Sequence, residues 1–180
     1  MNIDKSPAKD ALLQDDIRAM ASAFQKSRIL LTAYELDLFT VLGEESKSST
    51  DVAELLGTGK KATDRLMNAL CAIGLLEKNE GMFLNTSLSL RFLVKGKPGY
   101  MAGLMHVVHL WDTWSTLTEA VRHGKSVVAQ HIDKKNEEWR SAFIDAMHES
   151  GCKKAQSVVE LLDLNGVSRV LDVGGGSGAY

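Results

Sequence analysis

The glycine-rich segment at residues 169–178, with the sequence RVLDVGGGSG, constrains the fold of this chain more than any other feature. Its apolar residues Val170, Leu171 and Val173 predict a buried strand, and the glycines that follow predict a tight turn in which backbone can approach a ligand closely. Such a turn opens a helix in doubly wound α/β domains, where the strand has parallel neighbours. We therefore expect residues 169–178 to begin an α/β domain whose other strands lie beyond Tyr180.

Two kinds of ligand fit a glycine turn of this type. Gly174, Gly176 and Ala179 satisfy the dinucleotide pattern G-x-G-x-x-G/A. However, Asp172 stands at the end of the strand, and its carboxylate would repel a pyrophosphate at a cost on the order of a kcal/mol, even at an effective dielectric constant of about 20. An ammonium and a sulfonium reverse the sign of that interaction. The pattern therefore favours S-adenosylmethionine over a phosphate, and a structural turn without a ligand is the alternative.

The sequence before this segment is mainly helical. Apolar residues recur at helical spacing over residues 11–42, over 100–123 and over 136–162, and Gly43 and Gly124 end the first two stretches. The apolar stripe of the first stretch is wide. It indicates either a face for a partner chain or a helix buried in its own domain.

Residues 50–94 carry the local signals of a winged helix. Asp51 and Glu54 fit a capping box at the start of one short helix, and residues 60–73 form a second helix after a glycine turn. Residues 75–78 and 82–85 flank a three-residue loop in which Gly81 can adopt a positive φ, so they predict a β-hairpin. The segment 95–99, KGKPG, is the clearest linker in the sequence.

Composition excludes several classes of function for the chain as a whole. The formal net charge is −2 and the isoelectric point is about 6.2, so no overall charge attracts the chain to nucleic acid or to an anionic membrane. No apolar run reaches the roughly 18 residues that span a bilayer, and the polar N-terminus lacks the apolar core of a signal peptide. Cys71 and Cys152 lie among apolar neighbours, which predicts buried, reduced thiols and a cytoplasmic location.

The histidines do not predict a metal site. His106 and His109 are three residues apart and close enough on a helix to share an ion, but no Cys, Asp or Glu stands at ligand spacing to complete the site.

Residues 170–178 resemble motif I of the class I methyltransferases, and together with the upstream winged helix they resemble the small-molecule O-methyltransferases, such as the caffeate, hydroxyindole and bacterial polyketide enzymes. Residues 27–42 and 50–93 are similar to the second helix and the winged helix of that family. Residues 103–124, with His109, Trp114 and Leu117, are similar to its next helix. Phe143-x-x-Ala146-Met147 resembles the short motif that precedes the cofactor strand.

The resemblance implies a mainly α fold in three parts: a winged-helix dimerisation domain at residues 11–98, a connecting helix and loop at 99–135, and the start of a truncated Rossmann-like domain, with its first strand, at 136–180. It also implies a homodimer formed through the N-terminal helices. The residues it places against S-adenosylmethionine are Asp172, Gly174, Gly175, Gly176, Gly178 and Arg140. The residues it places near the acceptor are Phe143, Met147, His109 and Trp114, although Phe143 and Met147 also fit a buried helical stripe and Arg140 also fits a solvated surface.

The resemblance implies an S-adenosylmethionine-dependent O-methyltransferase acting on a small hydroxyl compound, expected to be aromatic. Its catalytic histidine, the carboxylate partner of that histidine and the acidic residue that binds the ribose are expected beyond Tyr180. The 180 residues are therefore expected to dimerise without turning over, and residues 171–180 are expected to be disordered or displaced. Two alternatives are a catalytically dead dimerisation scaffold and a winged-helix regulator that meets DNA phosphates through Lys60, Lys61 and Arg65.

Overall fold

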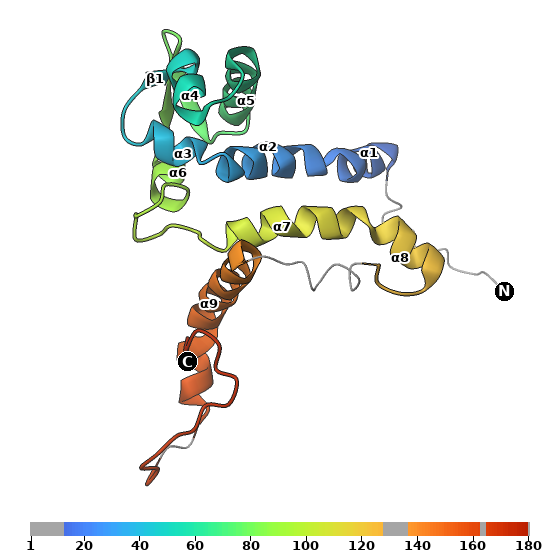
Figure 1. The fold of residues 1–180 in the computed structure, drawn as a ribbon, viewed down its shortest axis with the longest axis vertical. Helices are drawn as coiled ribbons and strands as arrows, with labels where there is room; N and C mark the ends of the chain where they lie inside the picture. The colour runs from blue at the N-terminus through green and yellow to red at the C-terminus, as the bar shows by residue number, and fades with distance from the viewer. Residues whose placement is uncertain (1–12, 128–136, 163–164, 180) are drawn as a thin grey trace, which may run out of the picture.

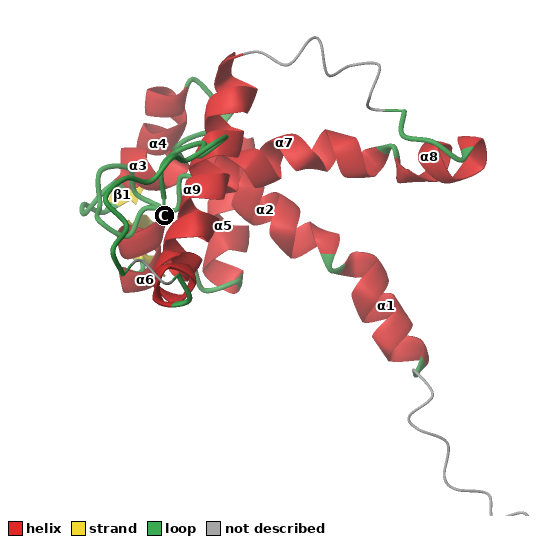
Figure 2. Cartoon of the chain, turned by 90° about the horizontal axis from the view of Figure 1, so that it is seen from below, coloured by secondary structure: helices red, strands yellow, loops and turns green. Residues whose placement is uncertain are grey.

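The computed structural model describes residues 13–127, 137–162 and 165–179. Figure 1 shows a small body of short helices and strands at one end, two helical arms that leave it side by side (residues 14–35 and 104–123), and a further helix that carries the C-terminal segment. Helix dominates the described chain (Figure 2). The elements in order are α1 (Gln14–Ser22), α2 (Phe24–Glu35), α3 (Leu38–Leu42), β1 (Lys47–Ser48), α4 (Ser49–Leu56), α5 (Lys60–Ala72), β2 (Leu76–Asn79), β3 (Met82–Asn85), α6 (Ser87–Phe92), α7 (Leu104–Ser115), α8 (Leu117–His123) and α9 (Glu137–Glu160).

The body has the predicted winged-helix arrangement. Helices α4 and α5 pack against each other, and β2 and β3 form an antiparallel hairpin in which Asn79 pairs with Met82. Gly81 has the expected positive φ of 81°, and Glu80 before it has a φ of 47°. Strand β1 pairs with β3 and completes a sheet of order β1-β3-β2.

The start of α4 differs from the sequence prediction. Ser48 is its N-cap, and the reciprocal bonds of the capping box join Ser48 to Asp51 rather than Asp51 to Glu54. The Ser48 hydroxyl accepts a hydrogen bond from the Asp51 amide at 3.2 Å, and the Asp51 carboxylate accepts one from the Ser48 amide at 3.3 Å. Because Ser48 also belongs to β1, the chain passes from strand to helix without a connecting loop.

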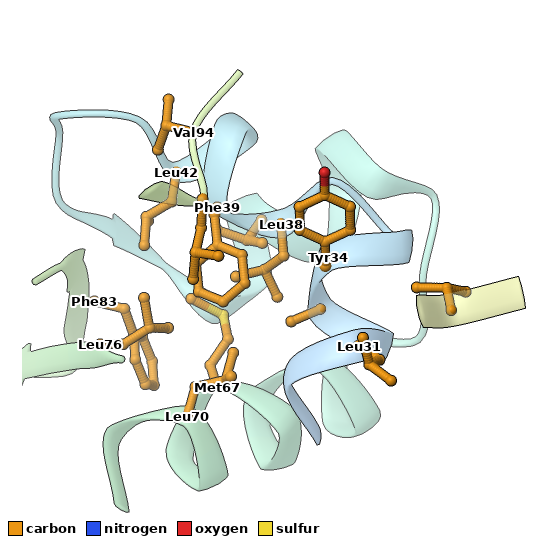
Figure 3. Packing of buried hydrophobic residues seen from close by; sticks show 14 residues of the cluster. Leu31, Tyr34, Leu38, Phe39, Leu42, Met67, Leu70, Leu76, Phe83 and Val94 are labelled. Carbon is orange, nitrogen blue, oxygen red and sulfur yellow. The ribbon is translucent and has the colours of Figure 1, made fainter. Parts of the chain in front are cut away.

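Buried apolar side chains from α3, α5 and the hairpin fill the centre of the body (Figure 3). Phe39, Phe83 and Met67 are fully buried there. Asn85 is a buried polar residue beside them, and its amide donates hydrogen bonds of 2.8 Å to the carbonyl oxygens of Phe39 and Gly43. The side chain thereby gives the Gly43 carbonyl a partner at the end of the short helix α3 and adds a second donor to the Phe39 carbonyl, which also accepts from the Gly43 amide at 3.0 Å.

The linker predicted at residues 95–99 is tied to the body. The Lys95 ammonium lies 3.0 Å from the Asp37 carboxylate, and Lys97 pairs with Glu44. At the end of the linker, the hydroxyl groups of Tyr34 and Tyr100 lie 2.6 Å apart, and Tyr34 also reaches the Met101 carbonyl at 2.9 Å. Burial, followed by the hydrogen bond with Tyr100, raises the pKa of Tyr34 well above its ordinary value, so the side chain is a neutral phenol.

Helices α7 and α9 cross at Gly103, the N-cap of α7. A Cβ at this position would lie 2.9 Å from the Ala146 Cα, so only glycine allows the two backbones to approach so closely. The Gly103 amide donates a hydrogen bond of 2.9 Å to the Glu149 carboxylate on α9. Glu149 thus satisfies one of the free amides at the start of α7.

The structure differs from the prediction at two elements, the helix over residues 100–123 and the strand at residues 169–173. The helix expected over residues 100–123 begins at Leu104 and breaks at Thr116 between α7 and α8. Residues 169–173 form no strand, and Val170, Leu171 and Val173 are 76%, 85% and 86% exposed. The prediction of a buried strand was wrong for this structure because a strand needs a neighbour to pair its backbone groups, and no such neighbour stands beside it in the described residues.

Candidate functional site

The glycine segment forms the predicted tight turn even without the strand. Gly174, Gly176 and Gly178 have φ values of 79°, 57° and 66°, which side-chain-bearing residues rarely adopt. The amide of Gly178 donates to the carbonyl of Gly175 at 2.9 Å. A Cβ built on Gly175 would overlap the carboxylate of Asp172. The turn therefore brings the predicted Asp172 and its glycines together, and the carboxylate lies directly over the backbone of the turn.

One side chain of the segment is hydrogen bonded to α9. The Ser177 hydroxyl lies 2.9 Å from His148 Nδ1, and the Cys152 sulfur lies 3.3 Å from His148 Nε2. The bond between Ser177 and His148 joins the exposed segment to the helix, whereas the contact between Cys152 and His148 lies within α9. Neither contact was predicted, since the i, i+4 spacing of His148 and Cys152 is the only signal in the sequence and nothing there points to Ser177. Both cysteines are free, as predicted, but neither is fully buried: Cys71 is half-buried, and Cys152 is exposed because it lies on this outer face of α9.

An aromatic cluster joins α7 to α9 and contains one predicted acceptor residue. Phe143 stacks on Trp139 with ring centroids 5.5 Å apart and planes at 5°. The His106 ring meets both edge-on, at 5.8 Å from Trp139 and 5.4 Å from Phe143. Met147, one turn beyond Phe143, is exposed. The structure thus places Phe143 and Met147 on one side of α9, with the cluster as a flat apolar wall.

His109 and Trp114, the two predicted acceptor residues of α7, lie apart. At about 100° per residue they stand roughly 140° from each other around the helix. His109 Nε2 is buried without a hydrogen-bond partner in the part of the chain that the structure describes. Trp114 is 67% exposed and lines a cavity of about 340 Å³ at the junction of α7 and α8. A buried ring nitrogen without a partner is costly, so His109 is the one of the two that is suited to a polar ligand.

Arg140 lies on the exposed surface of α9. Its guanidinium is 3.8 Å from the Glu137 carboxylate, and both side chains are exposed. Of the three cations proposed for DNA binding, Lys60 is 2.7 Å from Glu54, so this carboxylate offsets part of the charge of the α5 N-terminus.

Among the described residues, no three His, Cys, Asp or Glu side chains are close enough to hold a metal ion. The described helices include none that is long and apolar enough to cross a membrane.

The sequence matches two domain families of known proteins. The O-methyltransferase dimerisation domain matches residues 19–95, and the O-methyltransferase domain matches residues 114–180. The 3-hydroxy-5-methyl-1-naphthoate 3-O-methyltransferase of Streptomyces sahachiroi is 32% identical over 166 residues, which are 89% of this chain and 48% of that protein. The tetracenomycin polyketide synthesis 8-O-methyl transferase TcmO of Streptomyces glaucescens is 32% identical over 170 residues, 91% of this chain and 50% of that one. The chain spans about half the length of these curated relatives.

Solved structures agree on the fold. An O-methyltransferase family protein from Burkholderia thailandensis superposes with a TM-score of 0.78 at 28% identity, over 95% of this chain and 52% of that chain. The structure of PigF with SAH superposes with a TM-score of 0.80 at 22% identity, over 93% of this chain and 53% of that chain.

Proposed function

Since this chain belongs to the O-methyltransferase family, we propose that it supplies the dimerisation region and the first cofactor-binding segment of an S-adenosylmethionine-dependent enzyme that methylates the hydroxyl group of a small aromatic compound. The observation that carries this proposal is the position of the Asp172 carboxylate over a turn of three positive-φ glycines, downstream of a winged helix. The names of the two Streptomyces relatives support the reaction and the aromatic acceptor.

The glycine segment suits the chemistry of S-adenosylmethionine. Glycines without Cβ atoms let the backbone approach the ligand, and the Asp172 carboxylate can accept hydrogen bonds from its ammonium group. We assign Asp172, Gly174, Gly175, Gly176 and Gly178 to this contact, and Arg140 to the cofactor's carboxylate as a group of opposite charge. When bound, the cofactor supplies an electrophilic methyl group on a sulfonium.

The acceptor site that we propose is built on α7 and α9. Phe143 presents an aromatic wall together with Trp139, and the thioether of Met147 can adapt to the shape of a flat ring. His109 offers its buried Nε2 to a polar group of the acceptor. We assign Trp114, which lies apart from His109 at the junction of α7 and α8, as a second and more distant acceptor contact. Holding the acceptor in line with the methyl group is the contribution of these residues to the rate. We assign no catalytic base to residues 1–180.

The exposed apolar side chains of the helical arms support self-association. Ile17, Met20 and Phe24 on α1 and α2 are more than half exposed, and so are Leu117 and Val121 on α8. Surfaces of this kind mark protein interfaces. We propose a homodimer formed through these helices, with a dimerisation domain at residues 11–98, a connection at 99–135, a cofactor domain that starts at 136, and a cytoplasmic location.

The proposed assembly is tested by measuring the oligomeric state. Sedimentation equilibrium should show a dimer of residues 1–180, and Phe24→Asp should shift it toward monomer. Leu55→Asp is the matched control, because Leu55 is exposed on α4 outside the arms, and it should leave the dimer intact. A monomeric wild-type chain would contradict the proposed assembly.

Cofactor recognition is tested by titrating S-adenosylmethionine into isotope-labelled chain and following the amides of Gly174, Gly176 and Gly178. We expect weak, saturable shifts that Asp172→Asn diminishes several-fold, because the substitution removes the charge but keeps the shape of the side chain. Equal binding by the variant would overturn the role of Asp172. We also expect no methyl transfer from labelled cofactor to phenolic acceptors by residues 1–180 alone, so a labelled product would contradict the assignment of the base elsewhere.

A further inference from the structure

A cavity on the winged-helix body is unrelated to the cofactor and acceptor residues proposed above. It is open to solvent, has a volume of about 410 Å³ and is lined by Ser87, Leu90, Arg91, Lys97, Pro98 and Gly99. These residues come from α6 and from the linker that follows it. We infer that this cavity binds a small aromatic carboxylate.

The linker is held in place where it forms the wall of the cavity. A Cβ on Gly99 would lie 3.1 Å from the Arg91 carbonyl oxygen and 3.3 Å from the Phe92 ring, so the linker backbone packs directly on α6. The Met101 amide donates a hydrogen bond of 2.9 Å to the Phe92 carbonyl just beyond. The cavity is therefore formed before any ligand arrives, which lowers the entropic cost of binding.

The cavity has one cation whose charge is not balanced. The Arg91 guanidinium lies 4.9 Å from the centre of the Phe92 ring, which restricts its orientation. It has no acidic partner within residues 13–127, 137–162 and 165–179. Lys97, the other cation at the cavity, already pairs with Glu44. The cavity therefore attracts a single negative charge, and Arg91 is the group that receives it.

The lining determines which anion fits. A guanidinium presents paired N–H donors in a plane, which match the two oxygens of a carboxylate. Leu90 and Pro98 add apolar surface beside it, and the lining is predominantly apolar. A volume of about 410 Å³ lies within the range of small-molecule sites and has room for one or two rings. A flat monocarboxylate satisfies the charge and the apolar walls together, whereas inorganic phosphate would leave the apolar walls without contacts.

The test is a titration of the isotope-labelled chain with sodium benzoate, followed through the amide resonances of Leu90 and Gly99. Benzamide is the neutral probe of the same shape. We expect saturable shifts with benzoate and binding at least tenfold weaker with benzamide. Arg91→Gln should weaken benzoate binding at least fivefold and leave benzamide unchanged. Arg65→Gln, which removes an exposed arginine from α5, should have no effect.

Equal affinity for benzoate and benzamide would overturn the inference, and so would an unchanged benzoate affinity in Arg91→Gln. Unchanged resonances of core residues such as Leu70 and Phe83 establish that the variant is folded. The result is independent of the proposed enzyme activity, because cofactor binding is followed at the amides of Gly174 to Gly178 and benzoate binding at α6.

Discussion

The crossing of α7 and α9 at Gly103 is a position where one added methyl group should displace the backbone beside the candidate site. A Cβ at Gly103 would lie 2.9 Å from the Ala146 Cα, 3.0 Å from Glu149 Oε2 and 3.2 Å from the Ala146 Cβ. Carbon atoms in contact prefer about 3.5–4.0 Å, so Gly103→Ala must push the helices apart by roughly 0.6–1 Å. The nearest atom is backbone, which cannot rotate away as a side chain can.

The cost of this substitution can be estimated from two terms. Overpacking a close contact costs about 1–3 kcal/mol. Moving α9 also lengthens the 2.9 Å hydrogen bond from the Gly103 amide to Glu149, and a hydrogen bond to a charged group contributes roughly 1.5–3 kcal/mol when it is kept. Partial separation of the helices relieves the overpacking but weakens the hydrogen bond to Glu149. We therefore expect the free energy of unfolding to fall by about 2 kcal/mol rather than by the sum of the two costs.

Urea unfolding and hydrogen exchange of the α9 amides together measure this effect. Gly59→Ala is the matched control, because the nearest atom to its added Cβ is 3.9 Å away and its φ is −71°. Only the loss of a glycine N-cap applies there, so its cost should stay below about 1 kcal/mol. The reasoning fails if Gly103→Ala and Gly59→Ala cost the same, or if the α9 amides exchange at the wild-type rate in Gly103→Ala.

Three further predictions concern buried hydrogen bonds and the glycine segment. Tyr34→Phe should lower the free energy of unfolding by about 1–2 kcal/mol in urea, because the Met101 carbonyl loses its donor. Because the pKa of Tyr34 is raised in the folded state, its contribution to wild-type stability should be fully present below about pH 10 and be lost as the pH rises further, and this pH dependence should be smaller in the variant. Asn85→Leu should cost about 1–3 kcal/mol, because the Gly43 carbonyl loses its donor while the Phe39 carbonyl keeps only the Gly43 amide, and an unchanged urea midpoint would refute this. His148→Ala should speed amide exchange of the segment around Ser177 without changing that of α5, and equal rates in both proteins would show that this hydrogen bond does not hold the segment.

The parts of the fold that depend on residues close together in the sequence could be predicted from the sequence alone. The hairpin followed from one glycine between two apolar runs, and the structure gives Gly81 the expected positive φ. The helix of residues 60–73 followed from its apolar spacing. The two-residue strand β1 was missed, because a strand of this length has no alternation to detect. The N-cap of α4 is Ser48. It was predicted further along the chain because Asp51 and Glu54 also have the spacing of a capping box.

The candidate site was predictable only where its geometry is local. The left-handed turn of the glycine segment depends on its own residues and was predicted, whereas the strand before it depends on neighbours that must pair with it and did not form. The contact of His148 with Ser177 joins residues 29 positions apart, and the pair of Tyr34 and Tyr100 spans 66. No periodicity connects such residues, so only a three-dimensional structure could reveal them.

The linker at residues 95–99 connects the winged-helix body to α7. It is fixed to the body through Lys95, and Tyr100, which follows it, is hydrogen bonded to Tyr34. Gly103, the N-cap of α7, is fixed to α9 through Glu149. Helix α9 in turn carries Phe143 toward α7 and holds the glycine segment through His148. Because these joints are close contacts and hydrogen bonds, we expect a shift of the winged helix to displace α9 as well. A ligand bound beside Gly99 would therefore act on the same linker that positions the acceptor wall.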